Sequence, residues 1–485
     1  MKPGFEAVIG LEVHVQLRTR SKMFCACRNE YGCAPNTHTC PVCLGLPGAL
    51  PTLNGEAVAM GLRLAAAVGA EVNPRSTFYR KQYFYADLPK GYQITQGPVA
   101  LVSGGSLAIP GDPEVRGTMD PVEIRIERAH LEEDAGKSSH GAEPGVSWVD
   151  LNRAGLPLLE IVGGPDLRSP LEAHDWLKSL HQLVTWIGIC DGNMEEGSLR
   201  CDANVSVRRS GEASYGTRVE VKNLNSFRFV KQALQFEVDR HIRVLEAGGS
   251  LQPETRGYDP VSGETRVRRA KEGTVDYRAF PEPDLPVLEI AVAEIRAARA
   301  ALPELPETRR GRFQMAFGLG AEEVAALLQS RAFADYFEAL ASSCGDARAA
   351  SHWMLGEVSR LLNASGQSIE TFGASPEVLG ELIRLVLDRT LSLSMAKDEV
   401  LPAIRAGEGR ASEIVNRKGL GQVQDRQVLT ALIRTVLTAH PAQVAQVRAG
   451  KDALKGFLVG QVMKAGQGKV DARMVNELLA EELSR

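Results

Sequence analysis

Five of the eight cysteines lie within one short N-terminal segment and could form a metal site. Four of them follow the pattern Cys25-x-Cys27-x12-Cys40-x2-Cys43. Four thiolates can complete a tetrahedral shell around Zn²⁺, and clustered cysteines in a reducing compartment indicate metal rather than disulfides. Cys33 and His38 are competing ligands in the same segment, and unrelated buried cysteines are the alternative. Because the segment is polar, we favour a closed, structural zinc site that leaves Cys33 free.

A second group of polar residues could bind a divalent cation and phosphate. Glu12 and His14 would share one face of a strand, roughly 7 Å apart. Glu160 lies inside an apolar run, where a carboxylate is costly unless it meets a cation. Carboxylates with interspersed lysine and arginine suit Mg²⁺ and phosphate, but a solvated strand face is the alternative. The polar residues of this group are Glu12, His14, His130, Glu132, Glu133, Asp134, Lys137, Glu160, Glu195, Glu196, Arg200, Asp202 and Asn204.

A third segment, RKQYFYADLPKGYQ (80–93), mixes basic and aromatic residues. Such a mixture can stack bases and hold phosphates, and a half-buried aromatic strand with its loop is an equal alternative. Several other catalytic patterns are absent from the sequence. It has no G-x-G-x-x-G, no complete P-loop, no G-x-S-x-G and no H-E-x-x-H. If the protein uses ATP, it does so without a P-loop.

The elements that must position these residues are strands with one apolar and one polar face. Apolar and polar residues alternate at 7–17, 200–208 and 218–222. This alternation is typical of an antiparallel sheet covered on one side, and the continuous apolar runs of a parallel sheet are absent. Two helices are expected beside these strands. One begins at the Ser169-Pro170-Leu171-Glu172 capping box and ends near Gly188, and the other runs from Ser226 to Gly248-Gly249.

The chain has 485 residues, which suggests about three domains. Residues 1–293 read as mixed strands and helices, with the zinc segment at 25–43 as an insertion. Helical spacing then continues through 294–406 and 407–485. The boundary falls in the Gly407-Glu-Gly-Arg410 segment, where glycines leave the chain free to act as a joint. From Lys397 onward 14 Lys and Arg oppose 10 Asp and Glu, so the tail carries a mild positive excess.

Composition limits the class of protein. Apolar residues make up 44% and charged residues 24%, as in globular proteins with large cores. The net charge of −4 excludes a global basic excess, so nucleic-acid contacts must use local patches. No apolar stretch reaches 18 residues, and Glu6 and Glu12 interrupt any signal-peptide core. We expect a cytoplasmic protein without a membrane segment.

Taken together, the motifs resemble the B subunit of the glutamyl/aspartyl-tRNA amidotransferase (GatB). The resemblance runs from about residue 8 to the C-terminus. It rests on IGLEVHVQL, the C-x-C and C-P-V-C-L-G-L-P-G cluster, RKQYFYxDLPKGYQI, HLEEDAGK, DGNMEEGSLRCDxNVS, KNLNSFRFV, FLVGQVMKA and VNELL. It implies an α+β fold in which an antiparallel-sheet cradle domain, similar to that of glutamine synthetase, is followed by all-helical middle and tail domains, the tail binding tRNA.

The resemblance also implies an activity and partners. Such a subunit works with an amidase-type A subunit and a small C subunit in a glutamine-hydrolysing, ATP-dependent carbon–nitrogen ligase. It phosphorylates the side-chain carboxylate of Glu-tRNA(Gln), Asp-tRNA(Asn) or both, and ammonia from the A subunit then forms the amide. The non-discriminating aminoacyl-tRNA synthetase is a further candidate partner. The sequence leaves open which misacylated tRNA is used, and it does not identify the residues of the ammonia channel.

By the same resemblance, the Mg²⁺ ligands correspond to Glu12, His14, Glu132 and Glu160. Because histidine is an unusual Mg²⁺ ligand, Mn²⁺ is the alternative ion. Candidate ATP-phosphate contacts are Lys137, Arg200, Asn204 and Lys222. Zn²⁺ would be held by Cys25, Cys27, Cys40 and Cys43. The sequence departs from the family pattern at Gly163-Gly164, where a Ser-Glu pair is usual, and at Ala279, where a tyrosine is usual. Neither departure removes a proposed ligand.

Two other functions remain open. The chain could be a non-catalytic zinc subunit that docks tRNA while another subunit carries out the chemistry. A metal-dependent hydrolase would instead need a water-activating site open to solvent, and nothing in the sequence singles one out. Glu160 in its apolar run and the polar strand faces favour a catalytic subunit with its own phosphoryl-transfer site.

Overall fold

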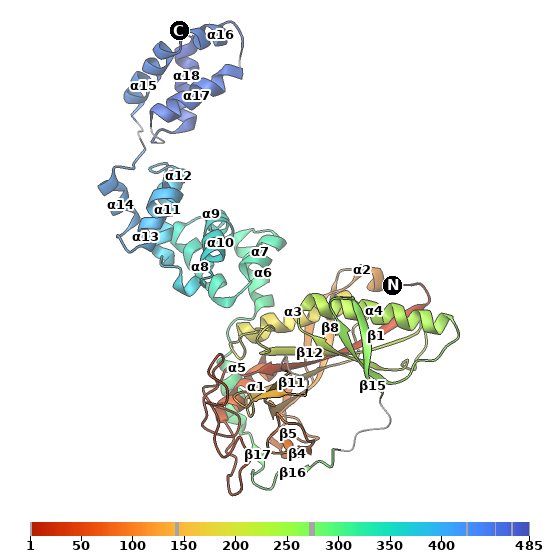
Figure 1. The fold of residues 1–485 in the computed structure, drawn as a ribbon. Coiled ribbons are helices and arrows are strands. Elements are labelled where there is room, and N and C mark those ends of the chain that lie inside the picture. Colours follow the sequence, from red (N-terminus) through yellow and green to blue (C-terminus); the bar gives the residue numbers. More distant parts are fainter. Residues whose placement is uncertain are drawn as a thin grey trace. The chain divides into compact units, whose positions relative to one another are not determined.

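The computed structural model describes residues 2–140, 145–270, 277–422, 425–451, 453–466 and 469–484. The chain divides into two compact units, Met1–Pro306 and Glu307–Arg485. The first unit is built on a large sheet with helices, and the second is helical (Figure 1). The finer division expected from the sequence, with boundaries at 293 and 406, stays a prediction.

The strands of the first unit include those expected from the alternating pattern: residues 7–17, 200–208 and 218–222 lie largely in β1, β12 and β13. The strands are β1 (Phe5–Gln16), β2 (Glu71–Val72), β3 (Arg75–Ser76), β4 (Phe78–Gln82), β5 (Tyr92–Gln96), β6 (Val102–Ser103), β7 (Ser106–Pro110), β8 (Pro121–Glu133), β9 (Lys137–His140), β10 (Ser147–Asp150), β11 (Pro157–Gly163), β12 (Leu199–Arg209), β13 (Val219–Leu224), β14 (Glu254–Asp259), β15 (Glu264–Ala270), β16 (Phe280–Pro281) and β17 (Leu288–Glu289).

Thirteen of these strands form one sheet in the described part of the chain. Its main order is β15-β14-β13-β12-β1-β11-β8-β5-β4-β16, with β2, β6 and β7 paired at the side. Two further pairs, β9 with β10 and β3 with β17, stand apart. β1 lies in the interior of the sheet between β11 and β12, so the face that carries Glu12 and His14 adjoins polar residues of both neighbours.

The expectation of a purely antiparallel sheet is corrected at one place. β13 pairs with β14 in parallel, whereas the other ladders of the described residues are antiparallel. The cause lies in the connection, because the long helix α4 (Phe227–Glu246) separates the two strands. A crossover helix returns the chain to the same end of the sheet, which permits parallel pairing. The sheet is therefore mixed.

Helices cover the apolar face of the sheet and leave the polar face of β1 to the site. α3 packs on β1 and β7, and α4 packs on α3, β12 and β13 (Figure 1). The expected caps are confirmed, because the side chains of Ser169 and Ser226 accept hydrogen bonds from Glu172 N and Phe229 N. The helices of this unit are α1 (Gly55–Ala67), α2 (Pro113–Arg116), α3 (Pro170–Trp186), α4 (Phe227–Glu246) and α5 (Val292–Ala300).

A buried ionic network joins α4 to the edge of the sheet. The fully buried carboxylate of Glu237 lies 3.0 Å from Arg256 Nε of β14 and 2.7 Å from Arg240 Nη2. We expect Glu237→Ala to lower the free energy of unfolding by about 3 kcal/mol, because it removes the buried carboxylate and leaves Arg240 and Arg256 to share Glu254. Urea unfolding of the purified protein measures this. The control is Asp239→Ala, an exposed carboxylate on the same helix. An equal loss in both variants would contradict the role of the network.

The second unit consists of helices. They are α6 (Pro306–Phe317), α7 (Ala321–Leu327), α8 (Arg331–Cys344), α9 (Ala347–Trp353), η1 (Met354–Val358), α10 (Ser359–Ser365), η2 (Ile369–Thr371), α11 (Pro376–Leu387), α12 (Leu393–Met395), η3 (Ala396–Val400), α13 (Leu401–Arg405), α14 (Ala411–Lys418), α15 (Arg426–Ala439), α16 (Pro441–Arg448), α17 (Ala453–Ala465) and α18 (Ala472–Ser484). Within the described residues, no helix is both long and apolar enough to span a bilayer.

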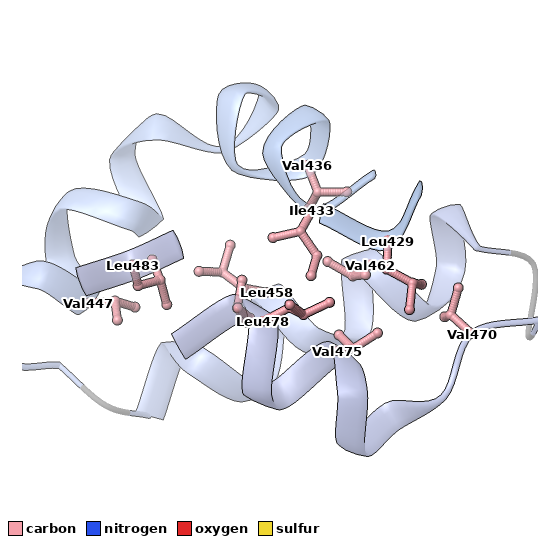
Figure 2. Packing of buried hydrophobic residues seen from close by; sticks show 11 residues of the cluster. Leu429, Ile433, Val436, Val447, Leu458, Val462, Val470, Val475, Leu478 and Leu483 are labelled. Carbon is pink, nitrogen blue, oxygen red and sulfur yellow. The ribbon is translucent and has the colours of Figure 1, made fainter. Parts of the chain in front are cut away.

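The last four helices enclose a hydrophobic core of their own. Figure 2 shows side chains from α15, α17 and α18, among them Ile433, Leu458 and Leu478, converging on one another. The buried residues of this cluster run from Leu429 to Leu483. We refer to residues 425–485 as the tail.

Candidate active site

The strand register gathers the proposed cation ligands on one face of the sheet. His14 lies opposite Glu160 of β11 on one side and opposite Arg200 of β12 on the other. Glu160 in turn lies opposite His130 of β8. Directly opposed residues of an antiparallel pair have Cβ atoms about 4.5–5.5 Å apart, so this register places their side chains within reach of one another.

Four side chains form what we call the carboxylate–histidine cluster: Glu12, His14, Glu132 and Glu160. The Nε2 atom of His14 lies 3.6 Å from Glu132 Oε1 and 3.7 Å from Glu160 Oε1. Glu132 is buried, and its other carboxylate oxygen accepts a hydrogen bond from Thr95 Oγ1 at 3.3 Å. Glu12 accepts a hydrogen bond of 2.8 Å from the side-chain amide of Asn204. The sheet thus brings together residues 148 positions apart in sequence, from Glu12 to Glu160.

The cluster concentrates negative charge in a buried place. Burial raises the pKa of Glu132, and the negative charge of Glu160 adds to the shift. Burial also raises the pKa of Glu12, against the hydrogen bond from Asn204. For Glu160 burial acts in the same direction, but its hydrogen bond with His130 and the charge of His14 together lower its pKa. The raised pKa values mean that the ionised carboxylates lack sufficient compensating charge.

A divalent cation fits this donor set. Carboxylate oxygens are the ligands that Mg²⁺ and Mn²⁺ prefer, and a bound cation would offset the burial and the like-charge repulsion that raise the pKa values of Glu12 and Glu132. Burial lowers the pKa of His14, and the charge of Arg200 contributes to the lowering, which favours the neutral imidazole that a metal needs. The ligand atoms of Glu12, His14, Glu132 and Glu160 are not all within 4.8 Å of one another. Mg²⁺ commonly retains several water molecules, which suits such spacing.

The four candidate phosphate contacts lie in different surroundings. Arg200 Nη2 is 2.9 Å from Asp134 Oδ2, and Lys222 Nζ is 2.7 Å from Asp202 and 2.9 Å from Glu220. Asn204 holds Glu12 and lines a hollow of about 880 Å³ with it. Lys137 is exposed on β9 and lines, with Arg200, a separate hollow of about 1260 Å³. The structure therefore places Asn204 at the cluster and Lys137 at a different pocket.

The sequence pattern placed His130, Asp134 and Asp202 in the polar group without identifying their partners, which the structure shows. His130 Nδ1 lies 3.5 Å from Glu160 Oε2, and Asp134 and Asp202 are the partners of Arg200 and Lys222. The positive charge of Lys81 lowers the pKa of both Glu132 and Glu160. Each of these residues lies in a motif of the sequence that contains other candidate site residues. Its partner could not be predicted, because the partner depends on the register of the strands.

Gly163 is the first of the two glycines that stand where a Ser-Glu pair is usual in the family, and its lack of a side chain is explained by packing. A Cβ atom on Gly163 would lie 3.2 Å from the ring of Trp176, a fully buried residue of α3. That distance is tighter than ordinary van der Waals contact, so a serine at this position would require the indole to move. The glycine therefore permits close packing of α3 on the sheet beneath the site.

The basic and aromatic residues at 80–93 divide into two groups. Arg80 donates to the buried carboxylate of Glu282 and stacks on Tyr92 at 4.4 Å, so it is engaged within the protein. Phe84 and Tyr85 are instead 83% and 66% exposed. The arginine belongs to the half-buried strand β4, and the two exposed rings are the part of this segment that is free to stack on a nucleotide.

The four predicted zinc ligands come together in the structure. The Sγ atoms of Cys25, Cys27, Cys40 and Cys43 all lie within 4.8 Å of one another, so this thiol cluster can hold a metal such as zinc. The pKa of Cys43 is lowered to about 4, chiefly by its hydrogen bond with Cys25. The fully buried Lys22 contributes, since its Nζ lies 3.7 Å from Cys43 Sγ. This cation offsets part of the negative charge of a four-thiolate shell.

We expect one chelator-resistant zinc ion per chain at the thiol cluster. Cys27→Ser should remove it and render residues 25–43 sensitive to protease, because metal binding supplies the folding energy of such a loop. Metal analysis and limited proteolysis measure the two effects. Cys344→Ser, which changes a buried thiol of α8, is the matched control and should retain the ion. A Cys27→Ser protein that is folded and retains its resistant zinc would show that the ligand set is wrong.

Comparison with known proteins identifies the family of the chain. Residues 7–296 match the model of the GatB/GatE catalytic domain, and residues 335–483 match that of the GatB domain. The chain is 50% identical over 483 residues to the B subunit of the aspartyl/glutamyl-tRNA(Asn/Gln) amidotransferase of Thioalkalivibrio sulfidiphilus, covering 99% of each chain. It is 51% identical to the B subunit of the same amidotransferase from Methylobacillus flagellatus, covering 99% of this chain and all of the other. The chain therefore belongs to the family of aspartyl/glutamyl-tRNA amidotransferase B subunits.

Proposed function

We propose that this chain carries the ATP-dependent step by which Glu-tRNA(Gln), Asp-tRNA(Asn) or both are amidated. The observation that carries the proposal is the carboxylate–histidine cluster, in which the carboxylates of Glu132 and Glu160 lie within 3.7 Å of His14 Nε2. Glu12 lies two residues before His14 on the same face of β1 and is held by Asn204. Burying so much negative charge is costly unless it serves a cation. Family membership supports the same substrate class, because the relatives are named for these tRNAs.

The proposed reaction has two steps. First, a side-chain carboxylate oxygen of the aminoacyl group attacks the γ-phosphorus of ATP, the bond to the bridging oxygen breaks, and ADP leaves. Second, ammonia attacks the carbonyl carbon of the acyl phosphate, phosphate leaves with the bonding electrons, and the nitrogen loses a proton to give the amide. The first step is needed because a free carboxylate oxygen is a poor leaving group. Catalysis of such transfers is mostly positioning and neutralisation of charge.

Glu12, His14, Glu132 and Glu160 would hold Mg²⁺, or Mn²⁺ in its place. When bound, the ion supplies positive charge next to the transferred phosphoryl group. The chain's own residues keep the ligands in place: Asn204 fixes Glu12, Thr95 fixes Glu132 and His130 fixes Glu160. Arg200 and Lys222 would contact phosphate from the adjoining strands, while Lys137 would act from the second hollow.

The assembly is part of the proposal. An amidase-type A subunit would hydrolyse glutamine and supply ammonia, a small C subunit would complete a heterotrimer, and the aminoacyl-tRNA synthetase is a further candidate partner. The first unit would form a cradle similar to glutamine synthetase, followed by a helical domain and a tRNA-binding tail. We place the complex in the cytoplasm, where its misacylated tRNA substrates are made.

The test is cleavage of ATP by the reconstituted three-subunit complex. We expect release of ADP to require this chain together with a misacylated tRNA, and separate assays with Glu-tRNA(Gln) and Asp-tRNA(Asn) identify the substrate. Uncharged tRNA is the control for the acyl carboxylate. If the A and C subunits cleaved ATP at the same rate without this chain, it would be a non-catalytic zinc subunit that docks tRNA.

A further inference from the structure

A second group of metal-ligating side chains lies inside the loop that joins the two halves of the thiol cluster. The ligand atoms of Glu30, Cys33 and His38 all lie within 4.8 Å of one another. Cys33 and His38 are half-buried and Glu30 is exposed. The thiol cluster uses the other four cysteines of the segment, so the loop holds two separate groups of ligands.

His38 has a ring nitrogen that the surrounding protein does not satisfy. Its Nδ1 atom is buried and makes no hydrogen bond within the described residues. A buried polar atom without a partner costs about 1–3 kcal/mol, so such atoms usually indicate a bound ion or water. Coordination of a metal through Nδ1 would supply the missing partner and leave the proton on Nε2.

The ligands also stand on a backbone that is held in place from outside the thiol cluster. The backbone N–H of His38 donates to Asn152 Oδ1 at 2.8 Å, and Asn152 Nδ2 donates to Ala34 O at 2.7 Å. Asn36 Nδ2 donates to Val149 O at 3.0 Å. Ala34, Asn36 and His38 are therefore anchored to segment 149–152, in addition to the thiol cluster at the two ends of the loop.

We propose that Glu30, Cys33 and His38 bind a second Zn²⁺ ion. A mixed set of one carboxylate, one thiolate and one imidazole suits Zn²⁺, which is borderline-soft and accepts all three ligand types. With three protein ligands, a water molecule completes the tetrahedron from the hollow of about 1260 Å³ that Glu30 and Cys33 line. An open shell exchanges its ion faster than the closed thiol cluster. Arg28 lies 3.8 Å from Glu30, but an exposed pair of this kind is weak competition.

Metal analysis of the full chain tests the proposal directly, and it does so independently of the proposed function. After equilibration with micromolar Zn²⁺ and gel filtration, we expect two zinc ions per chain. The chromogenic chelator 4-(2-pyridylazo)resorcinol should remove one of them rapidly and leave the other. Cys33→Ser and His38→Ala should each reduce the content to one resistant ion. Tyr31→Ala, an exposed neighbour in the same loop, is the matched control and should retain two.

Substitution with Co²⁺ gives a second readout that separates a lost site from a misfolded loop. Five thiolates would bind cobalt, four at the first site and one at the second, so Cys33→Ser should lower the thiolate-to-cobalt absorption by about a fifth. A single zinc ion in the unaltered chain would overturn the proposal. Two ions retained in both variants would overturn it as well, since the second ion would then lie elsewhere. Loss of both zinc ions in Cys33→Ser and in His38→Ala would show that the two ions share one ligand set, which would also overturn the proposal.

Discussion

Glu132→Gln is expected to lower tRNA-dependent ATP cleavage and amidation by more than about 100-fold. Residues that merely orient metal ligands typically cost about 10–100-fold when changed, and Glu132 is proposed as a ligand itself. The amide matches the carboxylate in size and retains the contact with Thr95, so it removes charge rather than volume. Rates of ADP release and amide formation by the three-subunit complex provide the measurement.

The partner's glutaminase activity should partly survive in this variant, because glutamine hydrolysis uses a separate site. Glu123→Gln is the matched control: it removes an exposed carboxylate from the same strand, β8, outside the cluster. Glu12→Ala and His14→Ala should behave like Glu132→Gln. Full amidation by all three cluster variants would eliminate the proposed cation site, whereas loss of glutaminase as well would point to failed assembly.

The sequence predicted the elements of the site better than their partners. Alternation along β1 is local information, and it placed Glu12 and His14 on one face before any neighbour was known. The pairing of His14 with Glu160 depends on the register between β1 and β11, and a slip of one residue would turn every side chain to the opposite face. Only the family resemblance connected these distant positions.

The parallel pair of β13 with β14 shows a different limit. The sequence at 218–222 alternates as an antiparallel strand does, because one face of this sheet is covered and the other is polar. Whether a neighbour runs parallel is decided by the connection, here the helix α4. Periodicity within a strand reports burial of its faces and carries no information on the direction of the next strand.

Arg200 and Lys222 show that side-chain type alone does not identify a phosphate contact. The family resemblance indicates Arg200 and Lys222 as phosphate contacts, and in the structure both are paired with carboxylates. Arg200 pairs with Asp134, which follows β8, and Lys222 pairs with Asp202 of the adjoining strand β12. A basic residue beside a predicted phosphate site and one that neutralises a neighbouring acid look alike in sequence. In the zinc segment the sequence also left Cys33 and His38 as competing ligands, and the distances group Cys25, Cys27, Cys40 and Cys43 apart from them.

The positive excess of the tail led us to expect contacts with tRNA phosphates, and the structure shows which basic side chains are available for them. Its arginines are largely used within the tail: Arg434 pairs with Glu482, Arg426 with Glu481, and Arg448 donates to the carbonyl of Leu483. Lys451 and Lys464 are exposed, and neither forms an ion pair within the described residues. Any contact with phosphate is therefore expected from these lysines rather than from the arginines.

The packing of α14 decides where the chain should be cut to test the tail. The predicted joint at 407–410 is followed by α14, which packs on α11 and α13 and whose Ser412 N donates to Glu381 Oε1 at 3.1 Å. Deleting residues 407–485 would expose that part of α11. Deleting 425–485 removes the whole core of the tail and leaves α14 in place. The boundary at 406 remains a prediction, and the shorter deletion tests the tail alone.

Removal of residues 425–485 should weaken tRNA binding and flatten its dependence on salt, while zinc content and assembly with the other subunits are retained. The reason is that contacts with backbone phosphates release counterions, so the number of these contacts sets the slope of log K against log salt.

Lys451→Gln with Lys464→Gln should reduce that slope by about 1 for each lysine that contacts a phosphate. Arg473→Gln is the comparison variant: it removes one positive charge from an exposed position where Glu477 lies 3.0 Å from the guanidinium, and it should change the slope less than the two lysine substitutions. Filter-binding titrations with tRNA at several salt concentrations measure the slope. A truncated complex that bound tRNA as tightly, with the same slope, would show that the tail stabilises the helical unit and does not bind tRNA.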